Sequence, residues 1–171
     1  LTAMVTPFRK DGAIDWNGVE VIADHLVKIG HDGIVVNGTT GEAPTTKSSE
    51  KEEIIKVVKK VVGEHIKVVS GAGDNETDYS VNQAKRSEAA GADGILVVTP
   101  YYNKPPQAGI KAHFLAMANA TGLPMMLYDI PGRTGVEIES DTIVELFEHP
   151  SIVALKDAKG NVAATSWVIK R

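Results

Sequence analysis

The chain has 171 residues, of which 43% are hydrophobic and 23% charged, and its formal net charge is −4. This balance excludes a disordered chain and a basic nucleic-acid-binding surface, and no apolar run approaches the roughly 20 residues of a membrane span. The absence of cysteine excludes disulfides, thiolate metal ligands and a thiol nucleophile, and it fits a cytoplasmic enzyme.

Short apolar runs alternate with helical patterns along the chain. The runs cover residues 1–5, 33–36, 66–70, 94–98, 124–128 and 152–155. Their length and their Val, Ile and Leu content are typical of parallel strands buried on both faces. Helices are expected near residues 19–29, 49–62, 79–90, 108–120 and 141–147. Ser49 and Glu52 have the spacing of a capping box, which predicts a helix start near Ser49.

A weak internal repeat supports this order of elements. The segments KIGHDGIVV and AAGADGILVV each end a helix at a glycine and enter a strand at once, which indicates repeated βα units of about 30 residues. Such units form a doubly wound sheet or a TIM barrel, and no G-x-G-x-x-G follows the first strand. We therefore predict an α/β fold, a (β/α)8 TIM barrel. Both ends look cut, so residues 1–171 are expected to be the N-terminal part of one catalytic domain, with about six βα units present.

A lysine at the end of the sixth strand raises the question of chemistry. In α/β folds ligands bind at the carboxyl ends of the strands, where Lys156 lies, whereas Lys67 begins its strand and is expected to be solvated. Counting in steps of two places Ala154 and Ile152 on the same side as Lys156. One interpretation is a side chain that extends to water. The other is a Schiff-base lysine, since burial favours the free amine that attacks ketones.

The neighbouring strand end offers partners for such a lysine. Tyr128 ends the fifth strand, and its phenol can shuttle protons at a carbinolamine, although an aromatic residue closing the barrel is the alternative. Arg133 follows in the same segment, MMLYDIPGRTG. Its guanidinium matches a carboxylate bidentately, or it is an exposed loop arginine.

Two further strand ends carry hydroxyl groups. Thr39 and Thr40, in NGTTGE after the second strand, can bind a small carboxylate or relay a proton, or they form a plain turn. Tyr101 and Tyr102, in TPYYNKPP after the fourth strand, suit a site or a subunit interface. Amine and hydroxyl groups thus end four strands of one predicted barrel, which favours an enzyme. The five histidines show no metal-ligand spacing, so no metal is expected.

The ordered motifs GTTGE, TPYYNKP, LYDIPGRTG and ALKDAKGN resemble those of the dihydrodipicolinate synthase family of class I pyruvate aldolases. The resemblance covers essentially the whole chain. It implies a TIM barrel with a C-terminal helical extension, usually a cytoplasmic homotetramer. It also implies condensation of pyruvate with L-aspartate 4-semialdehyde to give 4-hydroxy-tetrahydrodipicolinate, on the diaminopimelate route to lysine. No cofactor, nucleic acid or membrane is implied.

The resemblance also implies roles for individual residues. Lys156 would form the Schiff base with pyruvate, and Tyr128 would donate and accept the protons. Thr39 and Tyr102 would complete the proton relay, with Tyr102 reaching into the site of a neighbouring subunit.

Two more residues would bind the substrates. Thr40 would bind the pyruvate carboxylate, and Arg133 would hold the carboxylate of L-aspartate 4-semialdehyde. The family's chains are longer, so we expect the last barrel units and the helical extension to be absent here. The first and sixth strands would then be open edges, prone to aggregation, and the function would be that of the parent protein.

The resemblance breaks at a regulatory position. Some family members bind lysine near the GTTGE turn. At the matching places this chain keeps Asn75 and Tyr101 but carries Lys51 and Tyr79. A lysine ligand would be repelled by Lys51, so we expect weak or absent feedback inhibition, which potent inhibition of the full-length enzyme by lysine would contradict.

Other functions remain open at this point. A sister pyruvate aldolase of the N-acetylneuraminate lyase or 2-keto-3-deoxy sugar-acid type would use the same imine with another aldehyde, although sialic-acid lyases typically lack an arginine where Arg133 stands. An inactive barrel fragment is the alternative from another class. A nucleotide-binding protein is the weakest, because no phosphate loop is present.

Overall fold

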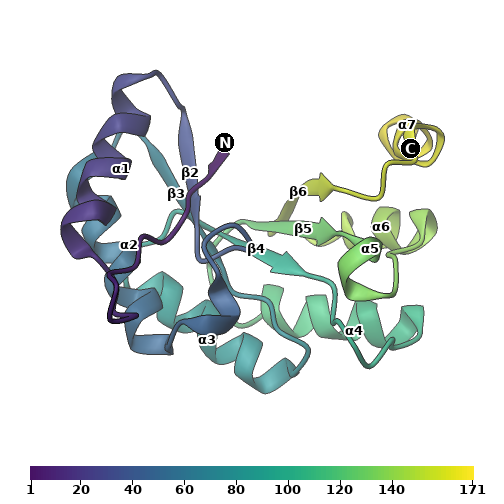
Figure 1. Cartoon of the computed structure of the whole chain (residues 1–171). Coiled ribbons are helices and arrows are strands. Elements are labelled where there is room, and N and C mark those ends of the chain that lie inside the picture. Colours follow the sequence, from purple (N-terminus) through teal and green to yellow (C-terminus); the bar gives the residue numbers. More distant parts are fainter. The chain divides into compact units, whose positions relative to one another are not determined.

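The structure of the chain is a computed structural model that describes residues 1–171. Six strands form one sheet in chain order (Figure 1): β1 (Thr2–Ala3), β2 (Gly33–Val36), β3 (Lys67–Gly71), β4 (Gly94–Val98), β5 (Met125–Asp129) and β6 (Ile152–Asp157). The helices are α1 (Trp16–Lys28), η1 (Ala43–Thr45), α2 (Ser48–Val62), α3 (Thr77–Ala89), α4 (Gln107–Ala118), α5 (Pro131–Thr134), α6 (Ser140–Leu146) and α7 (Val162–Lys170). The predicted alternation of strands and helices in an α/β fold is confirmed.

The helix starts show what sets the element boundaries. The side chain of Asp15 accepts a hydrogen bond from the Gly18 N–H at 3.1 Å, which caps α1. The capping box predicted for Ser49 and Glu52 is wrong. The helix begins at Ser48, and the Glu50 carboxylate accepts the Lys47 N–H at 2.7 Å. An acidic residue three positions after the cap can reach back to it, and here that residue is Glu50.

The chain divides into two compact units, of which the first comprises Leu1–Gly71 and Arg86–Ile95. In it β1, β2 and β3 pair in parallel, α1 packs against α2, and α2 contacts β3. The repeated aspartate has a structural role, because Asp93 accepts hydrogen bonds from the Val68 N–H at 2.8 Å and from Lys59 at 3.0 Å. Lys67 is 62% exposed, which confirms the solvated lysine.

The second unit comprises Ala72–Lys85 and Leu96–Arg171. Its strands β5 and β6 pair in parallel and run side by side in Figure 1, and α6 contacts both α4 and α7. Its core is built from fully buried apolar side chains, among them Phe114, Met125, Leu127 and Leu146. Such burial, at about 25 cal/mol per Å² of apolar surface, is the main stabilising contribution to the unit.

None of the helices is both long enough and apolar enough to cross a membrane.

Candidate active site

The ends of β5 and β6 bring two of the predicted residues into direct contact. Tyr128 and Lys156 are paired in the register of the two strands, and the Lys156 ammonium nitrogen lies 4.1 Å from the centroid of the Tyr128 ring. Tyr128 is only 6% exposed. A cation over a desolvated aromatic face is attracted by the ring quadrupole, so this contact fixes the end of the lysine side chain.

A shift of register decides which way Lys156 points. Met125 pairs with Ile152 but Met126 pairs with Ala154, so β6 carries one extra residue, Val153. Paired residues of neighbouring strands share a face, so Ala154 and Lys156 lie on the face of Tyr128, while Ile152 lies on the opposite face. The prediction that Ile152 shares the side of Lys156 is therefore wrong, because the extra residue interrupts the alternation. Lys156 is also the penultimate residue of the strand, since β6 extends to Asp157.

Behind these strand ends lies a buried ion pair that the sequence did not reveal. Asp129 follows Tyr128 and is fully buried, and its carboxylate lies 2.9 Å from the ammonium nitrogen of Lys159, whose side chain is 5% exposed. Burial raises the pKa of Asp129, and the positive charge of the neighbouring Lys159 ammonium opposes that rise. A carboxylate and an amine 30 positions apart in sequence give no local signal, and only the loop after β6 brings them together.

Arg133 lies on the short helix α5, where no helix is predicted from the sequence. Pro131 is suited to the first turn, because its φ is preset and it needs no N–H partner there. Gly135 ends the helix with φ of +76°, which glycine adopts without strain. Arg133 is exposed, so its guanidinium faces solvent a few residues after Tyr128.

Tyr101 and Tyr102 point to different surroundings. The Tyr101 hydroxyl donates to Asp74 at 2.9 Å, and burial together with that hydrogen bond raises the pKa of Tyr101 to about 12. Tyr102 is 86% exposed and has φ of +73°, a strained conformation for a tyrosine. Its N–H donates to the Thr134 carbonyl at 3.2 Å, which ties the segment after β4 to α5.

Thr39 and Thr40 belong to the first unit, where they form the turn after β2. The Gly38 carbonyl accepts the N–H groups of Gly41 at 3.1 Å and Ala43 at 3.2 Å, which closes the turn. Both threonines are exposed at its tip. The turn is held from below by Asn37, which is buried at φ of +55°.

Asn37 joins the ends of β2 and β3. Its side-chain amide donates to the Ser70 hydroxyl at 3.2 Å and to the Lys51 carbonyl at 3.1 Å. Only glycine fits at position 71, since a Cβ there would lie 2.0 Å from the Asn37 carbonyl oxygen. The close approach of the Gly71 and Asn37 backbones therefore fixes the start of the turn that carries the two threonines.

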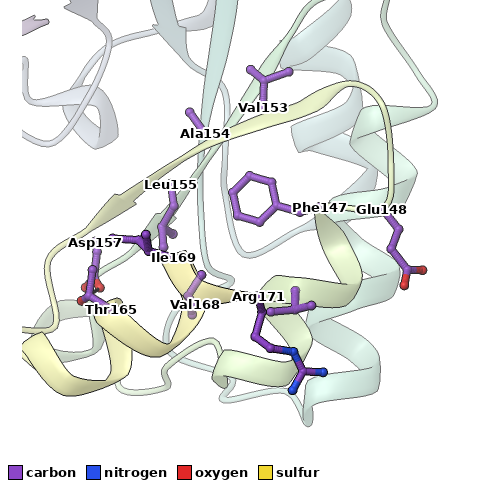
Figure 2. Close-up of a pocket in the computed structure, with 11 residues that line it drawn as sticks. Phe147, Glu148, Val153, Ala154, Leu155, Asp157, Thr165, Val168, Ile169 and Arg171 are labelled. Atoms are coloured by element: carbon purple, nitrogen blue, oxygen red, sulfur yellow. Dashed lines mark hydrogen bonds between the residues drawn. The ribbon is translucent and has the colours of Figure 1, made fainter.

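The geometry thus joins Lys156 and Tyr128 in direct contact. Arg133 and Tyr102 lie on segments that are linked through Thr134. Thr39 and Thr40 lie in a separate turn. In the second unit a groove of about 690 Å³ lies between β6, α6 and α7 (Figure 2). Its walls are mainly apolar, with Phe147 and Val153 among them, and neither Lys156 nor Tyr128 lines it. The contact between Lys156 and Tyr128 therefore lies outside this groove.

The comparisons with known proteins agree on one family. The model of the dihydrodipicolinate synthetase family matches residues 1–171. Over 171 residues the chain is 58% identical to a 4-hydroxy-tetrahydrodipicolinate synthase of Acidothermus cellulolyticus and 56% identical to a second such synthase, of Streptomyces coelicolor. All of this chain is aligned, but it spans only 56% and 57% of the length of those two relatives.

Solved structures give the same result for the fold. A dihydrodipicolinate synthase from Cyanidioschyzon merolae superposes with a TM-score of 0.96 at 48% identity, over 99% of this chain and 58% of the other. The enzyme from Acinetobacter baumannii, solved in complex with pyruvate, gives a TM-score of 0.96 at 43% identity over the same shares. The prediction of this family and of its fold is confirmed.

Proposed function

Because the chain belongs to the dihydrodipicolinate synthetase family, we propose that it carries the Schiff-base lysine of a 4-hydroxy-tetrahydrodipicolinate synthase. The observation that supports this most directly is the Lys156 amine lying 4.1 Å from the centroid of the buried Tyr128 ring, at the carboxyl end of β6. A phenol beside an amine suits imine chemistry, in which one group attacks the ketone and the other moves protons. The relative from Acinetobacter baumannii was solved in complex with pyruvate, which is a ketone that such an amine could attack.

In the proposed reaction the Lys156 amine attacks the keto carbon of pyruvate. The carbinolamine gains a proton on its hydroxyl, loses water and becomes an imine. Tyr128 supplies that proton and afterwards removes one from the pyruvate methyl group, which leaves an enamine. The imine itself withdraws the electrons, so this step needs no cofactor.

The enamine then attacks the aldehyde carbon of L-aspartate 4-semialdehyde. The amino group of that substrate displaces Lys156 from the imine carbon, which closes the ring and frees the enzyme. One molecule of water is lost overall, in the dehydration that forms the imine. The exposed Arg133 is proposed to bind the semialdehyde carboxylate through paired hydrogen bonds.

The remaining residues are proposed to serve the same reaction. Thr40 binds the pyruvate carboxylate through its hydroxyl and the turn N–H groups, and Thr39 relays protons with Tyr102. Tyr102 is 86% exposed, which fits a side chain that reaches into a neighbouring subunit's site. The family likeness carries the further proposals of a homotetramer, of cytoplasmic location and of a place in lysine biosynthesis.

The test is to incubate the protein with pyruvate, reduce it with borohydride and locate the adduct by mass spectrometry of peptides. We expect modification at Lys156 and none in the Lys156→Arg variant. Lys67→Arg is the matched control, since Lys67 begins its strand and is 62% exposed, and it should leave the adduct unchanged. An adduct spread over surface lysines, or none at Lys156, would contradict the proposal.

A second measurement identifies the acceptor aldehyde. Steady-state rates with L-aspartate 4-semialdehyde should exceed those with sugar aldehydes, and Arg133→Ala should raise KM for the semialdehyde while leaving the pyruvate adduct intact. Faster turnover of sugar aldehydes would instead indicate a sister pyruvate aldolase.

A further inference from the structure

The buried pair of Asp129 and Lys159 lies directly behind the contact between Lys156 and Tyr128. Asp129 follows Tyr128 in β5, so its side chain points to the opposite face of the sheet. Both charged side chains are almost fully buried, at 0% and 5% exposure, and their charged atoms lie 2.9 Å apart. Buried charges are costly to keep, so a pair placed here calls for an explanation beyond surface electrostatics.

The pair connects three segments of the second unit. Asp129 accepts the Ile138 N–H at 3.2 Å, and Lys159 donates to the Ile138 carbonyl at 3.0 Å. The Asp129 carbonyl accepts the Ala158 N–H at 2.8 Å. The end of β5, the segment after α5 and the loop after β6 are therefore joined through one ion pair.

The loop after β6 is fixed at a second point. Asp157 accepts the Lys159 N–H at 3.0 Å and the Thr165 hydroxyl at 2.5 Å. Figure 2 shows Asp157 and Thr165 facing each other between the end of β6 and α7. Asp157, the residue after Lys156, is thus fixed by hydrogen bonds from Lys159 and Thr165. Lys159 in turn ties the loop after β6 to Asp129 of β5.

We propose that Asp129 and Lys159 are positioning residues that clamp the carboxyl ends of β5 and β6, so that the Lys156 amine stays over the Tyr128 ring. Neither residue touches the reacting atoms. They act by fixing the backbone of the segments that carry Tyr128, Arg133 and Lys156. The inference rests on the proposed function for its effect on rate, but its geometric part stands on the contacts alone.

The test uses a double variant, Asp129→Asn with Lys159→Met, which removes both charges together. Replacing a buried ion pair by hydrophobic residues of similar volume is often close to neutral for stability, and asparagine at position 129 keeps an acceptor for the Ile138 N–H. We expect the thermal midpoint to change by only a few degrees, while the rate of pyruvate-adduct formation falls about 100-fold, as for a displacement of about 1 Å. A merely structural pair would leave that rate unchanged in the folded double variant.

A second readout does not depend on the reaction. The Lys156 nitrogen lies over the face of the Tyr128 ring, so we expect the NMR signal of the adjoining ε-methylene protons to be shifted upfield. The Lys156→Arg variant assigns that signal by removing it. In the double variant we expect the signal to return toward the position of the other lysines. If the Lys156 signal of the double variant keeps its upfield shift, the proposed clamp is wrong, whatever the rate of adduct formation. The proposal is also wrong if the parent protein shows no upfield-shifted Lys156 signal.

The outcomes separate the two proposals. A parent protein with the shifted signal but no adduct would reject the proposed function and leave the clamp to be judged by the NMR signal. If the double variant does not fold, Asp129→Asn alone keeps the Ile138 acceptor and should show the same loss of upfield shift. The control is Lys111→Met with Glu145→Gln, an exposed ion pair of 2.8 Å between α4 and α6, which should change neither readout.

Discussion

At the scale of single residues, a strained backbone marks a position where function is expected to outweigh local stability. Tyr102 has φ of +73° and is 86% exposed. A tyrosine in this region costs on the order of 1–2 kcal/mol, and the exposed ring regains little by packing. The residue therefore contributes little to the fold in which it is found.

Replacing Tyr102 by asparagine tests this reasoning. Asparagine tolerates the left-handed conformation, so we expect the free energy of unfolding to stay within about 0.5 kcal/mol or to rise. The rate of pyruvate-adduct formation should fall about 100-fold, because a proton relay loses its hydroxyl group. Chemical denaturation and adduct mass spectrometry measure the two quantities. Loss of several kcal/mol with an unchanged rate would show that Tyr102 is structural.

Contacts between site residues were predictable where the strand order alone decides which side chains become neighbours. Lys156 and Tyr128 each lie one residue before the end of consecutive strands, and the structure joins them. The pair of Asp129 and Lys159 was not predictable, since Lys159 resembles any loop lysine until the loop folds back on β5. The predicted side of Ile152 is wrong, because strict alternation holds only where no extra residue is inserted in the strand.

At the scale of elements, a buried histidine joins α3 to α4. His113 lies on α4 and is 4% exposed, and its Nδ1 is 3.0 Å from the Thr77 hydroxyl at the start of α3. Its Nε2 has no hydrogen-bond partner. Burial lowers the pKa of His113, although Asp74 and Glu76 oppose that shift. The packing of α4 therefore favours the neutral ring.

This lowered pKa predicts a dependence of stability on pH. Protonation is less favourable in the folded protein, so the stabilising effect is complete above about pH 6.5, the ordinary value of histidine. It is lost as the pH falls from there toward the lowered pKa. We expect the free energy of unfolding of the parent protein to fall more steeply between pH 7 and pH 5 than that of His113→Gln.

Denaturation curves at several pH values measure this slope. His65→Gln is the control, since His65 is exposed in the turn between α2 and β3, and it should keep the parent slope. Equal slopes for the parent and His113→Gln would mean that His113 does not resist protonation.

Elements were the most predictable level of the structure, and their exceptions have local causes. The strands β2 and β4 have the predicted bounds, because continuous apolar runs between turns leave no other choice. The helix η1 and the four-residue α5 were missed, since they are too short to show a helical period. They are stabilised instead by Pro44 and Pro131, which preset the first turn.

At the scale of the whole molecule, one edge of the sheet lies among exposed apolar side chains. The strand β6 is terminal in the strand order, and its own Val153 is 59% exposed, while Val162 and Ile169 of α7 are 78% and 80% exposed. A terminal strand beside exposed apolar side chains is prone to pairing with another chain.

We therefore expect the 171-residue chain to self-associate through β6 and α7. Changing Val162 and Ile169 to lysine should raise the dissociation constant at least about tenfold, since each removed contact is worth roughly 1 kcal/mol or more. Sedimentation velocity measures this constant. The control is Val21→Lys, at an exposed valine of α1 that is 58% exposed and should have no effect. A monomer at all concentrations would contradict the expectation.

The extra residue in β6 has a consequence for how this strand can change in evolution. It reconciles two demands, the burial of Ile152 opposite Met125 and the pairing of Lys156 with Tyr128, which a regular strand of this length could not meet together. Losing one residue between positions 152 and 156 would close the irregularity and satisfy both demands. Gaining one would require a second irregularity or turn the amine to the opposite face. Alignment gaps in this strand should therefore be deletions rather than insertions.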